Sequence, residues 1–215
     1  MFSTRSRRTL AVVIAAAALP LALTACGMDD SSSGKSSTSS AGKGSADQDG
    51  EGQAAQVSGP FGPGCASVPT EGAGSFDGMA QDPVATAASN NPALSTLVTA
   101  VKKAGLVDTL NNAENITVFA PTNDAFAKIP KADLDKVLAD KATLTKILTY
   151  HVVGQKLAPE KLESGTYATL EKSTLTTAGS GMSYKVNDSA SVVCGNVPTA
   201  NATVHIVDSV LMPKM

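Results

Sequence analysis

The stretch that decides the fold reads N-I-T-V-F-A-P-T-N-D-A-F-A-K-I-P, from Asn115 to Pro130. In its first half, Ile116–Ala120, aliphatic residues occupy every second position, which is the period of a half-buried β-strand. Pro121 lacks the N–H group that a sheet ladder uses, so we expect it to end this strand. The first half therefore predicts a short strand that stops at a sharp corner.

The second half of the stretch predicts a helix. Thr122 suits the N-cap position, and Asn123 and Asp124 follow in a first turn, where negative charge is favourable. Phe126 and Ile129 lie three residues apart and therefore share one side of the helix. Strand, corner and helix are thus expected within this single stretch.

The same stretch resembles the first signature of the fasciclin domain, T-V-F-A-P-T-N-x-A-F, and Thr117–Phe126 match it at every fixed position. Tyr150-His151, in L-T-Y-H-V-V, resembles the family's central Tyr-His motif, and Thr203–Pro213, T-V-H-I-V-D-S-V-L-M-P, resembles its closing strand. With three matches in the family's order, the chain is identified as a member of this family. The residues that match the motifs are Thr117, Phe119, Pro121, Thr122, Asn123, Phe126, Tyr150, His151, His205 and Asp208.

The chain is also similar to the secreted and lipid-anchored fasciclin proteins of mycobacteria. They share G-P-G-C, Q-D-P-V-A-x-A-A-S-N-N-P and V-V-C-G, found here at Gly62–Cys65, Gln81–Pro92 and Val192–Gly195. The resemblance implies an α+β fold in which a seven-stranded β-sandwich or wedge is flanked by helices. It also implies a role in adhesion or extracellular recognition, with neither catalysis nor a cofactor.

Periodicity in the rest of the domain agrees with an α+β fold. Helix starts are expected at Asp82-Pro83, with Asp as N-cap and Pro in the first helical position, and at Asn91-Pro92. The second of these helices should end at Gly105, and another should begin near Asp140. Short β segments are expected at His151–Val153, Tyr167–Leu170, Leu175–Thr177, Tyr184–Asn187, Ser191–Cys194 and Val204–Leu211. Helices first and strands later is typical of this class.

The N-terminus is typical of a targeting segment. Three arginines precede the apolar stretch Leu10–Leu23, which is short for a membrane span. The stretch ends in Leu23-Thr24-Ala25-Cys26, which resembles the bacterial lipobox. The resemblance implies that residues 1–25 are a lipoprotein signal peptide and that Cys26 is lipidated. An ordinary cleavable signal with an incidental cysteine is the alternative; the match of Ser6-Arg7-Arg8 to a twin-arginine signal is weak.

A low-complexity segment follows, from Gly27 to about Pro60, rich in Ser and Gly and without apolar periodicity. Such a segment cannot bury enough surface to order itself. A flexible chain of this length has a root-mean-square reach of roughly 30 Å. We therefore expect residues 26–64 to be the lipidated cysteine and a flexible tether, and residues 65–215 to be the fasciclin domain. Glycosylation of Ser and Thr is a second role for the tether, compatible with the first.

The charge of the chain excludes one class of partner. All three arginines lie in the signal peptide, so the 17 basic residues fall to 14 lysines against 19 Asp and Glu, a net charge of about −5. Nucleic acid binding needs a basic face that such a chain does not offer. The expected partners are the membrane, through Cys26, and an extracellular protein or an envelope or matrix polysaccharide. The expected location is the outer side of the cell membrane, with a fraction released.

Two cysteines remain once Cys26 is assigned to lipid. Cys65 and Cys194 belong to a chain that is expected to reach an oxidising compartment, where disulfides persist. The resemblance implies that they pair, as the corresponding cysteines of the mycobacterial proteins do. Two free thiols are the alternative.

The two histidines, His151 and His205, do not suggest a metal site, because zinc takes three or four ligands at characteristic spacing. His205 and Asp208 could form one edge of a catalytic triad, but the sequence holds no G-x-S-x-G nucleophile elbow. On a strand, two residues three apart also point to opposite faces. His151 is expected to be a packed structural histidine bonded to backbone.

Two alternative functions stay open beside adhesion. One is an envelope hydrolase, which would depend on His151 or His205. The other is a small-molecule carrier, which would need a sizeable apolar pocket.

Overall fold

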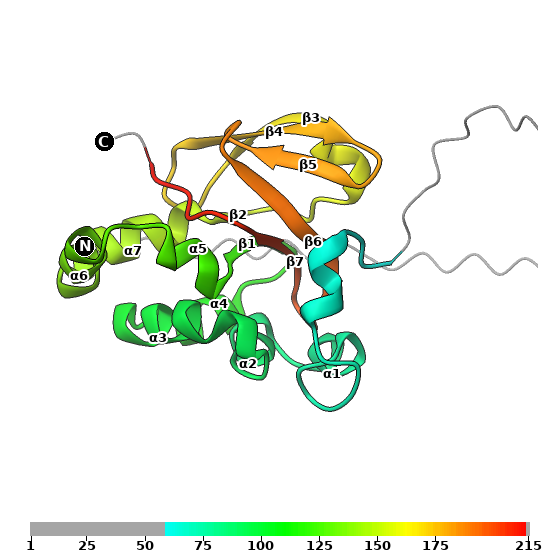
Figure 1. Ribbon diagram of the computed structural model, residues 1–215, viewed down its shortest axis with the longest axis horizontal. Coiled ribbons are helices and arrows are strands. Elements are labelled where there is room, and N and C mark those ends of the chain that lie inside the picture. Colours follow the sequence, from blue (N-terminus) through cyan, green and yellow to red (C-terminus); the bar gives the residue numbers. More distant parts are fainter. Residues whose placement is uncertain (1–58, 214–215) are drawn as a thin grey trace, which may run out of the picture. The chain divides into compact units, whose positions relative to one another are not determined.

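The computed structural model describes residues 59–213, in which seven strands form one sheet in the order β2-β1-β7-β6-β5-β4-β3. In Figure 1, helices α2, α3 and α4 lie on one side of strands β1 and β7, and strands β3, β4 and β5 lie on the other. The predicted α+β fold, a seven-stranded wedge flanked by helices, is confirmed. The predicted signal peptide, the lipidation site Cys26 and most of the linker fall outside the described residues.

Helices come before most of the strands, as predicted. The α-helices are α1 (Phe76–Gln81), α2 (Val84–Ser89), α3 (Ser95–Ala104), α4 (Val107–Asn112), α5 (Asn123–Ala127), α6 (Lys131–Ala139) and α7 (Lys141–Tyr150). Short 3₁₀ helices are η1 (Pro63–Ser67), η2 (Pro92–Leu94) and η3 (Pro159–Leu162). The strands are β1 (Ile116–Pro121), β2 (Val152–Val153), β3 (Ser164–Ala168), β4 (Thr174–Ser180), β5 (Ser183–Val186), β6 (Ala190–Pro198) and β7 (Ala202–Val207).

Strand β7 lies at the centre of the sheet. It pairs in parallel with β1 along its whole length, from Ile116 opposite Ala202 to Pro121 opposite Val207, and antiparallel with β6. All of its residues are buried. The closing strand and the strand that begins the signature stretch are therefore direct neighbours in the sheet.

The closing strand is shorter than predicted, since it ends at Val207 rather than Leu211. The Thr122 N–H group donates a hydrogen bond to the Val207 carbonyl, and the Asp208 side chain accepts one from the Ser191 N–H group. Beyond these bonds the chain leaves the ladder, and the buried Leu211 donates its N–H group to His151 instead.

Strand β6 divides the sheet into the two arms of the wedge. Its first residues pair with β5, opposite Lys185 and Val186, and its later residues pair with β7. Register shifts on either side of Cys194 mark the point where it bends, and such bulges sharpen the local twist of a strand. Figure 1 shows β6 running from the β3–β5 arm down to the helical side.

Alternation along β1 and β7 supplies two separate hydrophobic cores. The first lies between the helices and one face of these strands, and it includes Leu97, Val101, Phe126, Leu148, Val118, Val204 and Ile206. The second lies within the wedge, and it includes Phe119, Val153, Leu175, Tyr184, Val186 and Val207. Each large apolar side chain that is fully buried contributes roughly 1.5–3 kcal/mol relative to exposure. Strands β1 and β7 stabilise both cores at once.

The N-terminal segment of the domain is attached to β6. Phe61 exchanges both backbone hydrogen bonds with Gly195, at 3.0 and 2.7 Å, and its ring meets Tyr184 edge-on at 5.4 Å. A side chain at position 195 would lie 2.2 Å from the Phe61 ring, so this contact requires glycine. Four residues after Phe61, Cys65 forms a disulfide with Cys194, which confirms the predicted pairing and shows the two-free-thiol alternative to be wrong.

The predicted helix ends are right where the signal is local. Thr122 accepts a hydrogen bond from the Ala125 N–H group at 3.1 Å and caps α5. Gly105 ends α3 in the left-handed conformation, with φ of 74°. The prediction at Asp82-Pro83 is wrong in detail: α2 begins at Val84, whose N–H group donates to the Asn201 side chain, and Asp82 instead ends α1.

Cys65→Ser should lower the melting temperature and leave Cys194 open to alkylation. The bridge spans a sequence separation of 129, and closing a loop of that length is worth roughly 4–5 kcal/mol in the chain-entropy model. Thermal unfolding and alkylation of the folded chain measure both effects, with the double variant Cys65→Ser, Cys194→Ser as control. Two free thiols in the intact mass of the wild type would contradict the bridge.

Thr177→Val should stabilise the fold by about 1 kcal/mol, because a buried hydroxyl without a hydrogen bond costs free energy that a methyl group of the same shape does not. The Thr177 hydroxyl is buried and has no partner among residues 59–213. Urea unfolding measures the gain. Thr166→Val, at an exposed position of the adjacent strand, is the matched control and should change the free energy of unfolding by less than about 0.5 kcal/mol. Equal shifts in the two variants would mean that the gain comes from β-propensity alone.

Candidate binding site

The signature residues of β1 are buried and serve the fold. The Thr117 hydroxyl donates to the Gln155 carbonyl and accepts from the Leu157 N–H group, both at 2.8 Å, and so orders the segment after β2. Phe119 is fully buried and stacks on His205 with ring centroids 5.5 Å apart. None of these side chains is accessible to a partner molecule.

The signature residues of the corner also bond to the chain itself. The Asn123 side chain accepts from the Thr96 N–H group at 2.9 Å and donates to the Pro92 carbonyl at 2.9 Å, which ties α5 to the start of α3. Pro121 ends β1, and Phe126 is buried in the first core. The corner therefore orients helices against the sheet.

His151 joins α7 to the C-terminal segment. Its Nε2 atom accepts from the Leu211 N–H group at 2.9 Å, so the ring proton must sit on Nδ1, which faces the Ile147 carbonyl at 2.8 Å. Burial lowers the pKa of His151 to about 4, against the opposing effect of the Ile147 carbonyl. The ring is neutral, and both of its nitrogens are occupied.

His205, on β7, also bonds to backbone groups through both ring nitrogens, but as the opposite tautomer. Its Nδ1 atom accepts from the Asn196 N–H group at 3.1 Å, so the proton sits on Nε2 and faces the Leu157 carbonyl at 3.4 Å. Burial lowers its pKa to about 4, while the Leu157 carbonyl works in the other direction. Neither histidine is free to take a proton from a substrate hydroxyl.

Asp208 does not complete a triad with His205. It accepts from the Ser191 N–H group at 2.8 Å and forms an ion pair with Lys128 at 3.2 Å. Partial burial works to raise the pKa of Asp208, but the hydrogen bonds from Ser191, Lys128 and Ser209 together hold it below its usual value. Within residues 59–213, no group of three His, Cys, Asp or Glu side chains could hold a metal ion.

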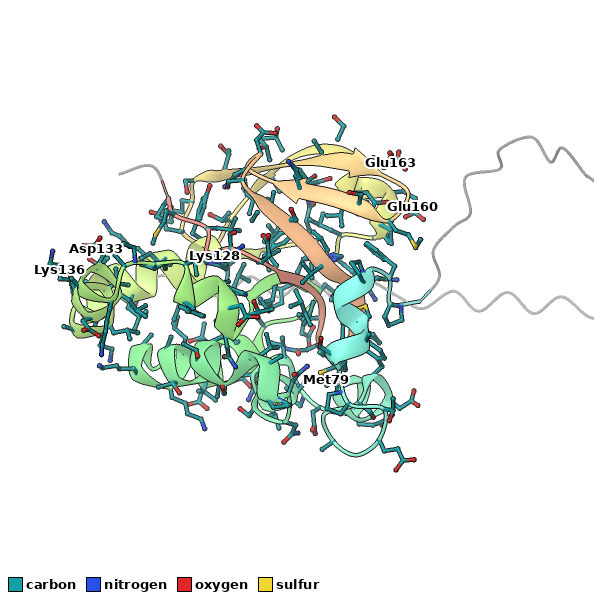
Figure 2. The ribbon with its side chains drawn as sticks, viewed as in Figure 1. Met79, Lys128, Asp133, Lys136, Glu160 and Glu163 are labelled. Atoms are coloured by element: carbon teal, nitrogen blue, oxygen red, sulfur yellow. A yellow bond between two sulfur atoms is a disulfide. The ribbon has the colours of Figure 1, made fainter. Side chains whose placement is uncertain are left out.

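An open groove beside α5, the α5 groove, has a volume of about 510 Å³. Its walls come from η1, α5, β6 and the end of β7, and they include Ser67, Thr122, Asp124, Lys128, Val193 and Asp208. Figure 2 labels Lys128 at the C-terminal end of α5, and the Lys128 side chain is 56% exposed. Ser67 and Val193 are not predicted from the sequence, because the Cys65–Cys194 bridge brings them there. The groove offers charges of both signs beside apolar surface.

A second open groove, the Tyr150 groove, has a volume of about 570 Å³. It is lined by Tyr150, Ser173, Thr174, Thr176, residues 187–189, Val210 and Met212. The Tyr150 hydroxyl lies at the centre of a small network: it donates to the Thr174 carbonyl at 3.0 Å and accepts from the Asn187 side chain at 2.8 Å. Of these residues the sequence predicts only Tyr150; the Asn-Asp-Ser turn between two β segments was an available signal.

The apolar space beneath the helices is small. A cavity of about 50 Å³ lies between α2, α3 and α4 and strands β1 and β7. Sites for drug-sized ligands measure roughly 300–1,000 Å³. The sizeable pocket that a carrier of such molecules needs is not present there.

Among residues 59–213, none of the helices has the length and apolar character needed to span a membrane.

A family model and individual relatives both place the chain in the fasciclin domain family. The family model described as "Fasciclin domain" matches residues 92–213. Immunogenic protein MPB70 of Mycobacterium bovis is 51% identical over 161 residues, which cover 71% of this chain and 81% of that protein. Cell surface glycolipoprotein MPB83 of the same species is 51% identical over 160 residues, which cover 71% of each chain.

A solved structure is similar in fold. It is a FAS1 domain pair from the insect cell adhesion molecule fasciclin I, with a TM-score of 0.52 and 20% sequence identity. The match covers 63% of this chain and only 52% of that structure. At this identity the likeness concerns the fold.

The free energy of unfolding should fall as the pH falls from 6.5 to 4. Each buried histidine has a pKa of about 4 when folded and about 6.5 when unfolded, so the unfolded chain binds more protons in this window. The slope is up to ~1.4 kcal/mol per pH unit for each histidine, or about 3 kcal/mol for each over the window. The contribution is complete above pH 6.5.

Urea unfolding at intervals of half a pH unit measures this slope. Asp208, whose pKa lies below its usual value, adds a loss only below about pH 3.8, so the two effects occupy separate windows. Stability that stays constant between pH 6.5 and 4.5 would contradict the neutral, doubly bonded state of both histidines.

Proposed function

The chain belongs to the fasciclin domain family, and from that premise we propose that it is a lipid-anchored surface protein whose domain binds an extracellular protein or an envelope polysaccharide. The resemblance stated from the sequence is confirmed by the family match and by the 51% identity to MPB70 and MPB83. The name of MPB83, a cell surface glycolipoprotein, supports a surface location.

One observation carries the proposal of binding rather than catalysis. The two histidines are buried and have both ring nitrogens occupied, whereas the accessible polar groups line open grooves. A general base must reach the proton that it removes. Open grooves with fixed walls instead suit contact with a partner, which supports adhesion over the hydrolase alternative.

The α5 groove is the proposed contact for a protein partner. Asp124 and Lys128 supply opposite charges a single helical turn apart, and Val68, Val193 and Ile206 supply apolar surface. Mixed charges around an apolar centre are the usual anatomy of a protein interface. Since η1 is held there by the disulfide, the groove is formed before the partner arrives.

The anchor is the proposed lipid on Cys26. Between Cys26 and the first described residue, Gly59, runs the Ser- and Gly-rich linker, which would give the domain a reach of roughly 30 Å from the membrane. A single acyl chain binds membranes only marginally, so stable anchoring requires a second fatty chain. The released fraction would then carry the same binding domain.

Cys26→Ala should move the full-length protein out of the detergent phase or block its processing, because the variant has no thiol to acylate. Detergent-phase partitioning of cell extracts measures this. Wild-type protein that partitions to the aqueous phase, or a variant that partitions as the wild type does, would contradict lipid anchoring. That result would leave the binding function open, because the grooves lie in the domain.

Asp124→Lys should abolish capture of a protein partner by the lipid-free chain that begins at Gly27, because it reverses one charge of the α5 groove. Capture from envelope and matrix extracts, followed by affinity measurement with the purified partner, gives the readout. Asp135→Lys, an exposed charge reversal on α6, is the matched control and should bind as the wild type does. Equal capture by both variants would remove the α5 groove as the contact.

A further inference from the structure

We propose that the Tyr150 groove binds a neutral oligosaccharide and that Asp188 is the residue that accepts hydrogen bonds from its hydroxyl groups. This rests on the proposed binding function and deepens it, because it assigns a ligand class to one groove. The support comes from the rigidity of the groove, from the conformation of Asp188 and from the chemistry of the walls.

The groove walls are rigid before any ligand arrives. Asn187 makes two hydrogen bonds to the backbone of Thr176 in β4. Its N–H group donates to the Thr176 carbonyl at 2.8 Å, and its side-chain oxygen accepts from the Thr176 N–H group at 2.9 Å. Its amide nitrogen donates to the Tyr150 hydroxyl, which in turn donates to Thr174. A site whose walls are already fixed loses little entropy on binding. The groove is thus preorganised.

Asp188 occupies an unfavourable backbone position without any structural contact of its own. Asn187 and Asp188 both have positive φ, 51° and 56°, and the Ser189 N–H group donates to the Val186 carbonyl, which is a type I′ turn. Glycine is strongly preferred at the second of these positions. The Asp188 side chain is exposed and makes no hydrogen bond or ion pair within residues 59–213. Such local strain is typical of residues that serve binding.

The chemistry of the walls selects the ligand class. The hydroxyls of Ser173, Thr174, Thr176 and Ser189 and the carboxylate of Asp188 offer donors and acceptors to a polar ligand, and no lysine lines the groove. Two of these hydroxyls also bond within the protein, Ser173 to Glu171 and Thr176 to Asn187. An anionic glycan would meet the Asp188 charge without a compensating cation, which costs free energy. The exposed Met212 and the half-buried Val210 supply an apolar flank for the C–H face of a sugar ring.

Size favours a short glycan over a protein interface. The groove volume of about 570 Å³ lies within the roughly 300–1,000 Å³ of small-ligand sites. The adjacent β3–β4 pair exposes Thr166, Thr174 and Thr176. Further sugar units can continue along that hydroxyl-bearing face.

The test is titration of the lipid-free chain that begins at Gly27 with neutral oligosaccharides of two to six mannose, glucose, galactose or arabinose units. Calorimetry and backbone NMR monitor the titration. Binding should shift the amide signals of Thr176 and Ser189. Asp188→Asn keeps a residue that tolerates the left-handed turn and removes only the charge. It should weaken binding roughly tenfold, because a carboxylate accepts a stronger hydrogen bond from a sugar hydroxyl than a neutral amide oxygen does. Asp135→Asn, at an exposed position of α6 that lines neither groove, is the matched control and should bind as the wild type does.

A second variant separates a binding role from a structural one. Asp188→Gly relieves the strain of the turn, so it should keep or raise the melting temperature while it loses oligosaccharide binding. A lowered melting temperature for this variant would make Asp188 a structural residue and overturn the proposal. So would wild-type affinity in Asp188→Asn, tighter binding of an anionic probe such as polyglycerol phosphate, or a peptide that displaces the sugar.

Failure of this inference and failure of the proposed function are distinguishable. A chain that binds no neutral oligosaccharide, yet loses a protein partner on Asp124→Lys, overturns the inference and leaves the proposed function standing. A chain that loses oligosaccharide binding on Asp188→Asn supports both.

Discussion

Strand β7 is buried on both faces, and the remainder of the domain is arranged around that constraint. One face meets the helices through Val204 and Ile206, and the other meets the interior of the wedge through His205 and Val207. A strand in this position needs a partner on each edge, and β1 and β6 supply them. The helical layer, the bend of β6 and the placing of η1 all follow from covering these two faces.

The residues that identify the family keep this arrangement together. The side chains of Thr117, Asn123 and His205 each bond to backbone groups of a segment that lies far from them in the sequence. A polar group that is buried without a partner is costly, and these side chains remove that cost where loops cross the core. The recognisable part of the sequence therefore encodes the scaffold, and the two grooves combine such residues, Asp208 and Tyr150 among them, with less distinctive stretches such as residues 187–189.

Sequence patterns predict the parts of this fold that depend on neighbours along the chain. The alternation in Ile116–Ala120, the cap at Thr122 and the glycine at Gly105 each act within a few residues, and each element is found where it is expected. The expectation of a half-buried strand is wrong, because helices cover one face of β1 and the wedge interior covers the other. The start of α2 depends instead on Asn201, which lies 117 positions away, and no local pattern contains it. The grooves are harder still, because their walls come from elements that only the sheet and the disulfide bring together.

The attachment of the N-terminal segment to β6 has a mechanical consequence. A pull on the linker enters at Phe61 and passes through the Cys65–Cys194 bond into the middle of the sheet. Because that bond closes a covalent loop across a separation of 129, tension between the linker and β7 cannot stretch the chain inside the loop. The load falls instead on the antiparallel pairing of β6 with β7. The residues between Cys65 and Cys194 therefore add nothing to the length of the domain when its two ends are pulled apart.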